Sequence, residues 1–310
     1  MKTIKGIFVS IVAPFDNHIA NGGEKLLGNA SSIKRRPDGR VYVAGQMQRH
    51  VFFSALNRLN KAEKEQVEGT TIGTFVSNAD GISEDLLHDL RADLGGFMHT
   101  EQGNLSSRRT GALSVTMAVA KEESKVKNDL LNRVDAGSGN APAIATKEFS
   151  QHDDMVMNFY LDMYSLCVTE MPEYEGGYNV KINYNGHGIP EAERKRRVKL
   201  FLQSTALMND YANQSRNAVC GEPRQVIIVF DTVASRKASR YWEAECIERN
   251  NIIKELQGRD AKIFIGDDKT EKSVFDAYAE AYQELETSSL YDPVSNRDGN
   301  EESNTESTSD

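Results

Sequence analysis

The feature that most constrains the fold of this chain is the order of six segments with the apolar patterns of strands and helices. Gln225–Asp231 is a continuous apolar run, as in a buried strand, and Leu113–Ala120 alternates as a half-buried strand does. Gly45–Gln66 has apolar residues at helical spacing, which make one stripe. With three further segments the order becomes strand–helix–strand–strand–helix–strand. The further segments are Ile4–Ala13 (strand), Met155–Val168 (strand) and Pro190–Arg216 (helix).

This order predicts an α+β fold of the ferredoxin-like type, the arrangement also used by RNA-recognition domains. Residues 1–66, 111–120 and 155–285 would form this palm, and two insertions, 67–110 and 121–154, interrupt it. Because the strands that flank the second insertion should pair, its ends should lie together, and we expect it to project as an arm. Beyond the sixth segment we expect a helix near 236–257, a strand at Ala261–Ile265 and a helix near 270–286.

The formal net charge of −9 is distributed unevenly along the chain. Residues 1–60 contain nine Lys and Arg but three Asp and Glu, whereas residues 286–310 contain seven acidic residues and one arginine. The acidic segment is rich in Ser, Asn and Thr and has little to bury, so we expect 286–310 to be a disordered tail. A local basic face matters more to nucleic acid than the mean charge, so the acidic total does not exclude such a partner.

Other patterns favour a cytoplasmic protein. The sequence has no run of about 18 apolar residues, so we expect no membrane-spanning helix. The apolar N-terminal stretch is not followed by a small-x-small cleavage pattern, and we interpret it as a buried first strand rather than a signal peptide. Cys167, Cys220 and Cys246 are widely spaced, which favours a reducing compartment and no structural zinc. We expect no metal and no cofactor.

Residues 21–50 are the part best suited to a polyanion. The glycines between Asn21 and Asn29 allow close backbone approach and left-handed conformations. The triplet Lys34–Arg36 supplies positive charge, and each arginine can bind two phosphate oxygens. A helix then begins with Gly45-Gln-Met-Gln-Arg-His50, where free N–H groups and the helix macrodipole favour an anion.

These blocks, together with Asp93–Met98 and Ser106–Val115, carry a resemblance to a known family. Over residues 4–230 the chain resembles the DevR-type backbone subunit of CRISPR Cascade complexes. The resemblance implies an RNA-recognition-like palm, fingers at 67–110 and a thumb hairpin at 121–154. It also implies that several copies line up along one guide RNA (crRNA), each thumb reaching over the neighbouring copy's stretch and displacing a base.

A guide RNA has many sequences, so its backbone subunit must contact phosphate and sugar rather than read bases. We expect His50 to donate a hydrogen bond or stack, Phe97 and Met98 to wedge or stack against bases, and Arg108 and Arg109 to hold the guide near the fingers. The complete set of expected RNA contacts is Asn21, Gly22, Asn29, Ser31, Lys34, Arg35, Arg36, Gln46, Gln48, Arg49, His50, Phe97, Met98, Arg108 and Arg109.

Several of these residues also have a purely structural interpretation. Lys34–Gly39, taken alone, is typical of a solvated turn, and Phe97 and Met98 are typical core residues. A second basic cluster, Arg194–Lys199, alternates with glutamates and is typical of a solvated helix face.

The expected function is that of a non-catalytic Cascade backbone subunit, which polymerises along the guide RNA and presents its bases for pairing with target DNA. The expected partners are guide RNA, further copies of the chain, other Cascade subunits and, through the guide, target DNA. One alternative is a guide-processing endoribonuclease of the same fold superfamily, with His18 or His50 as general base. A second is a nucleic-acid-binding autoregulator. Asp16 has no second carboxylate beside it to make a metal site.

Overall fold

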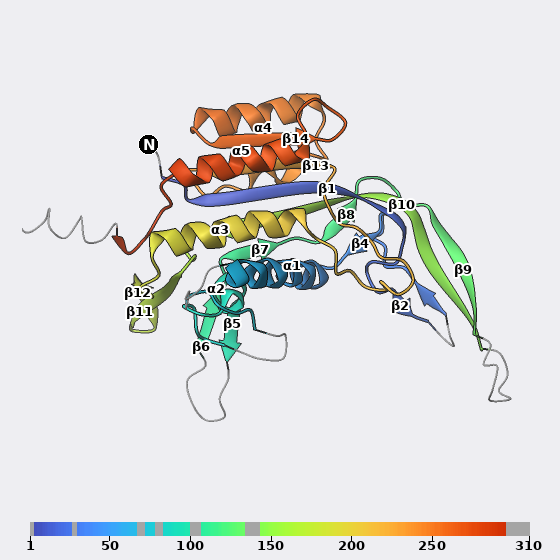
Figure 1. Ribbon diagram of the computed structural model, residues 1–310, viewed down its shortest axis with the longest axis horizontal. Coiled ribbons are helices and arrows are strands. Elements are labelled where there is room, and N and C mark those ends of the chain that lie inside the picture. Colours follow the sequence, from blue (N-terminus) through green and yellow to red (C-terminus); the bar gives the residue numbers. More distant parts are fainter. Residues whose placement is uncertain are drawn as a thin grey trace, which may run out of the picture.

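The protein is a mixed α+β structure, as the order of segments predicts. A central sheet has helices on both sides, and hairpins extend from it (Figure 1). The computed structural model describes residues 3–26, 30–66, 72–77, 83–99, 107–133 and 143–295.

The central strand of the sheet is β1 (Gly6–His18), because its residues pair on both sides. It is antiparallel to β10 (Ala143–Asp162) and to β13 (Gln225–Asp231). Beyond β13, the antiparallel strand β14 (Lys262–Asp267) follows next in the sheet. Two strands that are far apart in sequence, β10 and β13, are thus held on either side of the N-terminal strand.

Short strands line the other side of β10. Both β7 (Leu113–Val115) and β8 (Ala118–Ala120) pair antiparallel with β10, and β4 (Tyr42–Val43) pairs with β8. Farther along, β3 (Ser31–Ser32) is parallel to β10 and antiparallel to β2 (Glu24–Lys25), so the sheet is mixed. The loop that carries the basic triplet is therefore attached to this side of the sheet.

Successive side chains of β1 reach opposite faces, as strand geometry requires, and enter two separate cores. Ile7 and Ile11 face the larger core, which α1, α3 and α5 cover, whereas Phe8 and Val12 face a smaller core under α4. Each large apolar side chain buried in this way contributes about 1.5–3 kcal/mol. These helices are α1 (Gly45–Gln66), α3 (Glu191–Ala206), α4 (Cys246–Gly258) and α5 (Val274–Thr287). The 3₁₀ helix η1 (Lys237–Arg240) precedes α4 in the sequence.

The bounds of α1 and β13 agree with those predicted, but the second predicted helix is shorter than expected. It ends at Ala206 instead of residue 216, because Leu207 leaves the helical region and Asn213 adopts a positive φ of 63°. The predicted helix near 236–257 is divided into η1 and α4. Within the described ranges, no helix is long and apolar enough to cross a membrane.

Several hairpins of the described residues extend from this body (Figure 1). One is formed by β9 and the first half of β10, which pair from Val126 with Ser150 to Arg133 with Ala143. A second hairpin follows the short helix α2, and a third precedes α3. Their elements are β9 (Val126–Arg133), α2 (Leu90–Gly95), β5 (Gly96–His99), β6 (Ser107–Thr110), β11 (Val168–Glu175) and β12 (Tyr178–Gly186).

The segment after α5 is packed against the body. Ile4 forms a parallel bridge with Leu290, whose side chain is buried in the larger core, and Arg194 donates a 2.7 Å hydrogen bond to the carbonyl oxygen of Tyr291. The expectation of disorder from residue 286 is therefore wrong for 286–295, because Leu290 and Tyr291 provide apolar surface that the body buries. Residues 296–310 lie outside the described residues.

Candidate nucleic-acid interface

The loop between β1 and β4 is organised by Asn21, whose side chain is buried. Its Nδ2 donates to the backbone oxygens of Lys34 (3.0 Å) and Tyr42 (3.1 Å), and its Oδ1 accepts from the N–H of Gly23 (3.0 Å). The RNA contact expected of this side chain is therefore corrected to a structural role: Asn21 holds the loop that carries the basic triplet.

Three further predicted contacts belong to the same loop. Gly22 is exposed and has a φ of 76°, a left-handed conformation that glycine adopts without strain. Ser31 is half-buried in β3, where it pairs with Lys25 and lies opposite Lys147. Asn29 lies outside the described residues.

The basic triplet has only loose ion pairs. Nη2 of Arg35 lies 3.4 Å from Glu148, and Nε of Arg36 lies 3.6 Å from Asp38, while Lys34 has no side-chain partner among the described residues. Exposed pairs of this kind contribute about 0–1 kcal/mol. An incoming phosphate can therefore replace these carboxylates at little cost. Loose pairs of this kind are also typical of a solvated turn, but they are not structural salt bridges.

The first turns of α1 divide the predicted contacts into two groups. Gln46 and His50 are exposed, and this first turn contains no acidic residue. Gln48 is fully buried, and its Oε1 accepts a 3.2 Å hydrogen bond from the hydroxyl of Tyr211. Because successive residues of a helix are rotated by about 100°, position 48 faces the core while 46 and 50 face solvent. The RNA contact expected of the Gln48 side chain is therefore corrected to a structural role in the core.

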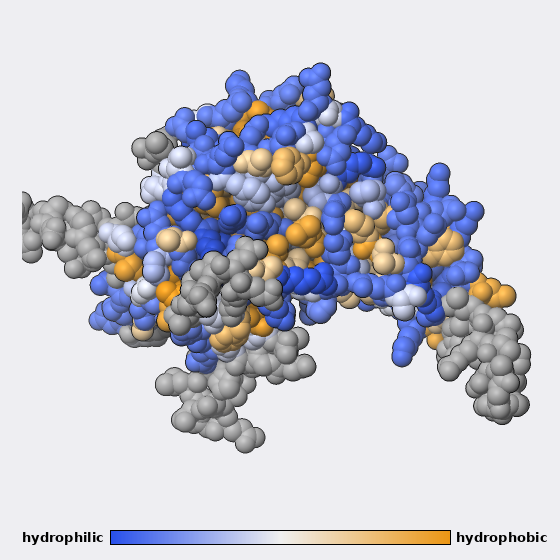
Figure 2. Space-filling model, in the orientation of Figure 1, coloured by the Kyte–Doolittle hydropathy of each residue, from blue (hydrophilic) through white to orange (hydrophobic). Residues whose placement is uncertain are grey.

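A groove of about 520 Å³ lies beside these turns, and we call it the α1 groove. Among the described residues its lining contains two arginines and no carboxylate; the charge of Arg109 is paired with Asp93, so Arg49 supplies the positive charge that suits an anion. The lining residues are Arg49, Gly95, Gly96, Phe97, Arg109, Thr110, Gly111, Leu113, Ser114 and Val115. Most of the face drawn in Figure 2 is hydrophilic, with smaller hydrophobic patches.

Arg49 joins α1 to the opposite wall of the groove. Its Nη2 donates a 2.7 Å hydrogen bond to the carbonyl oxygen of Gly95, and its guanidinium lies over the ring of Phe53. Burial, and then the nearby Arg91, lower the pKa of Arg49. An arginine still stays charged at neutral pH, because its ordinary pKa is far above 7. Arg49 thus places a positive charge at the groove, although one face of its guanidinium packs on Phe53 and its Nη2 bonds Gly95.

The hairpin of β5 and β6 presents two of the predicted contacts and buries a third. Met98 lies opposite Arg108 and is 69% exposed, and Arg108 is exposed with no partner among the described residues. Phe97 is half-buried in the lining of the groove, opposite Arg109. The core interpretation is therefore wrong for Met98, which is open to a ligand.

Arg109 is 7% exposed and is committed to the protein. Its guanidinium pairs with the carboxylate of Asp93 at 2.9 Å and donates to the carbonyl oxygens of Ala92, Val168 and Ser165. A buried guanidinium with this many acceptors has no N–H group left for a phosphate. The expected RNA contact through the Arg109 side chain is therefore corrected to a structural role.

The second basic cluster, expected to be a solvated helix face, has two buried members, Arg194 and Arg197, and three half-buried ones. Arg197 is fully buried and pairs with Asp93 at 2.8 Å and with Glu193 at 2.9 Å. Arg194 is also buried and bonds the segment after α5. Sequence reasoning missed this network, since its partners are far apart in the chain. The one available signal was Asp93 itself, an acidic residue between Ala92 and Leu94 in an apolar stretch.

The residues considered for a nuclease do not assemble into a site. His18 is fully buried: its Nε2 lies 2.7 Å from Oδ2 of Asp153, and its Nδ1 accepts from the N–H of Ala20. With both ring nitrogens occupied, His18 cannot take a proton from an RNA hydroxyl. Asp16 is exposed and pairs with His152 at 2.6 Å. In the described parts of the chain, no group of three or more His, Cys, Asp or Glu residues could hold a metal ion.

Comparison with known proteins assigns the family. The family model described as "CRISPR-associated negative auto-regulator DevR/Csa2" matches residues 21–229, which include the basic loop, α1, β5–β6 and the β9–β10 hairpin. This chain belongs to the DevR/Csa2 family. The resemblance to this family that the sequence motifs indicated is thereby confirmed. No curated protein matches the chain in sequence.

Two solved structures have the same fold as this DevR/Csa2-family chain. One is a chain of a "CRISPR RNA-guided surveillance complex", with a TM-score of 0.50, 14% identity and coverage of 93% of this chain and 94% of the other. The other belongs to a "CRISPR RNA-guided surveillance complex, pre-nicking", with a TM-score of 0.55, 12% identity and coverage of 93% and 96%.

Proposed function

We propose that this chain is a non-catalytic backbone subunit of a CRISPR surveillance complex. In this proposal it binds guide RNA through phosphate and sugar, several copies lie side by side along the RNA, and the bases are held open for pairing with target DNA. The observations that carry the proposal are the α1 groove, whose lining among the described residues has no carboxylate, and the basic triplet, which is half-buried to exposed and only weakly paired. Contacts of this kind bind any RNA sequence, as a guide-binding subunit requires.

The fold supports a ferredoxin-like palm. Strands β13, β1 and β10 lie in this order, with β7 on the far side of β10, and α1 and α3 cover one face. If the strands are numbered by the predicted motif, this order is 4-1-3-2, and all neighbours are antiparallel. We assign the fingers to 67–110 and the thumb to 121–154, the segment that contains β9 and the start of β10.

We propose no catalytic activity, because neither histidine considered as a general base is suited to that role. His18 has no free ring nitrogen, and His50 is exposed with no acidic or basic partner among the described residues. A general base needs a neighbour that sets its orientation and pKa, and neither residue has that together with access to a substrate.

Equilibrium binding tests the proposal. The purified protein should bind several unrelated single-stranded RNAs with similar affinity, and the logarithm of its binding constant should fall steeply with the logarithm of salt concentration. Binding to only one RNA sequence, or no dependence on salt, would contradict the proposal.

The family description names a negative autoregulator, so a nucleic-acid-binding autoregulator is the alternative function. A regulator of its own gene should prefer one duplex DNA sequence over unrelated duplexes and over single-stranded RNA. Competition between a duplex from the region upstream of its gene and a single-stranded RNA of equal length distinguishes the two functions.

A further inference from the structure

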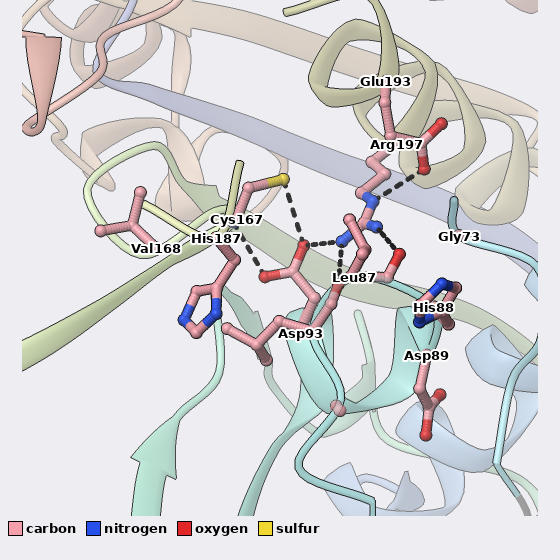
Figure 3. Close-up of polar contacts among 12 residues, drawn as sticks. Gly73, Leu87, His88, Asp89, Asp93, Cys167, Val168, His187, Glu193 and Arg197 are labelled. Carbon is pink, nitrogen blue, oxygen red and sulfur yellow. Dashed lines mark hydrogen bonds and ion pairs between the residues drawn. The ribbon is translucent and has the colours of Figure 1, made fainter. Parts of the chain in front are cut away.

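A buried ionic network lies directly behind the α1 groove. We call it the Asp93 network, and it consists of Asp93, Arg109, Cys167, Glu193 and Arg197. The carboxylate of Asp93 is fully buried and accepts four hydrogen bonds. Its Oδ1 accepts from Nη2 of Arg109 (2.9 Å) and the N–H of Cys167 (2.9 Å), and its Oδ2 accepts from Nη1 of Arg197 (2.8 Å) and Sγ of Cys167 (3.4 Å). Figure 3 shows the contacts of Asp93 with Cys167 and Arg197.

The donors come from three separate parts of the fold. Arg109 belongs to β6, Cys167 to the turn between β10 and β11, and Arg197 to α3, while Asp93 itself is in α2. Arg197 also donates to the carbonyl oxygens of Leu86 (2.8 Å) and Leu87 (2.9 Å), which precede α2. One carboxylate therefore fixes the β5–β6 hairpin to the helical layer of the body.

The charges of the network balance within the protein. Arg197 pairs with the carboxylates of both Asp93 and Glu193, Arg109 pairs with Asp93, and none of the four side chains is more than a tenth exposed. Burying a charge is costly unless it is paired and hydrogen-bonded, so removing one member leaves the others uncompensated. The Cys167 thiol takes no part as a nucleophile, since burial and the adjacent Asp93 carboxylate raise its pKa well above the ordinary value.

The network reaches the groove through the backbone. Asp93 precedes Gly95, whose carbonyl oxygen accepts from Arg49, and Gly96, which has a φ of 69°. A Cβ on Gly96 would overlap the backbone of Arg109 and Gly111, so the two walls of the hairpin touch without side chains between them. Any shift of Asp93 or Arg109 must therefore move the groove lining from Gly95 to Phe97.

We propose that Asp93 is a positioning residue for RNA binding: through Arg109 and Arg197 it sets the separation between α1 and the β5–β6 hairpin, and so the shape of the α1 groove. It does not touch RNA. This inference rests on the proposed function, because it assumes that the α1 groove binds the RNA backbone.

The test compares Asp93→Asn with Asp231→Asn. Asp231 is also fully buried and pairs with Arg259 through two bonds of 3.1 and 2.7 Å, but it lies on the α4 side of the sheet. Each substitution removes one negative charge from a buried ionic cluster. Both variants are titrated with labelled single-stranded RNA below their melting temperatures.

Asp93→Asn should lose affinity by about tenfold, equivalent to about 1.4 kcal/mol, whereas Asp231→Asn should bind as the wild type does. The loss cannot come from net charge, because removing a carboxylate near the groove by itself favours a polyanion. The salt dependence of binding should stay unchanged in Asp93→Asn, since every phosphate-binding residue is still present. Amide hydrogen exchange at Gly96 and Phe97 should rise in Asp93→Asn alone.

If Asp93→Asn binds normally, or if Asp231→Asn loses as much affinity, the inference is wrong. Should Asp93→Asn fail to fold, Arg197→Lys keeps the buried charge but removes donors to Leu86 and Leu87, and it should show a smaller loss of affinity with the same unchanged salt dependence. If the wild type itself binds no RNA, or a variant with Lys34, Arg35 and Arg36 changed to alanine binds normally, the proposed function fails. If the wild type binds RNA but Asp93→Asn and Arg197→Lys bind it equally well, the positioning role is wrong and the proposed function still stands.

Discussion

The hydroxyl of Tyr211 donates a 3.2 Å hydrogen bond to Oε1 of Gln48, and both side chains are buried beneath the first turns of α1. This pair faces away from the surface that Gln46 and His50 present. The same short sequence therefore supplies both a core contact and a surface suited to RNA.

Replacing Gln48 by leucine should lower stability without changing RNA affinity. The substitution removes the amide acceptor of a buried phenol, which costs about 1–3 kcal/mol of unfolding free energy. Gln46→Ala is the matched control: it should change stability by less than about 0.5 kcal/mol, because its side chain is exposed, and it should weaken RNA binding. Urea denaturation and RNA titration measure the two quantities, and a reversed pattern would contradict the assignment of faces.

Changing Lys34, Arg35 and Arg36 together to alanine should weaken binding to all RNA sequences alike. The slope of the logarithm of the binding constant against the logarithm of salt concentration should fall by about 0.7 for each phosphate that the variant no longer binds. The control changes Lys254, Lys262 and Lys269 to alanine, which removes the same charge from exposed positions on α4, β14 and the turn after it. Equal effects from both variants would mean that net charge, rather than the basic loop, determines binding.

Stability should depend on pH through His187. Its ring lies 2.8 Å from Oγ1 of Thr169, and burial, followed by the nearby charge of Arg109, lowers its pKa. The unfolded chain then binds the proton more readily than the folded protein does. The stability that neutral His187 contributes is complete above the unfolded value of about 6.5 and is lost as the pH falls below it.

Urea midpoints measured at pH 7.5 and 5.5, values about one unit either side of that pKa, check this. The drop in the midpoint should be larger for the wild type than for His187→Gln, which cannot take up a proton there. An identical drop in both proteins would assign the pH dependence to other groups.

RNA should remain intact in the presence of the protein, with magnesium or with EDTA. Among the two histidines considered for a nuclease, only His50 is accessible to a substrate. Cleavage that disappears in His50→Ala, while binding persists, would replace the scaffold by an endoribonuclease. Gel analysis of end-labelled RNA over several hours separates these outcomes.

Local patterns in the sequence predicted the elements that bury a continuous stripe. The helix Gly45–Gln66 and the strand Gln225–Asp231 have the bounds expected, because their periodicity decides which face is apolar. The end of α3 was predicted ten residues late, since the turn at Leu207 depends on backbone geometry rather than on composition.

The roles of individual polar residues were harder to predict. Arg108 and Arg109 are adjacent in sequence, yet the first is exposed and the second is buried, because successive residues of a strand face opposite sides. Arg109 is stable inside only because Asp93 and several carbonyl oxygens receive its N–H groups, and these acceptors lie up to 59 positions away. Partners this distant cannot be found from spacing in a single sequence.

The most direct test of the central claim is to count protein copies on RNA by native mass spectrometry. The account predicts that unrelated single-stranded RNAs bind several copies, and that an RNA of twice the length binds about twice as many, since the backbone offers the same contacts along its whole length. One copy on every RNA whatever its length, or assembly on a single sequence only, would contradict the account.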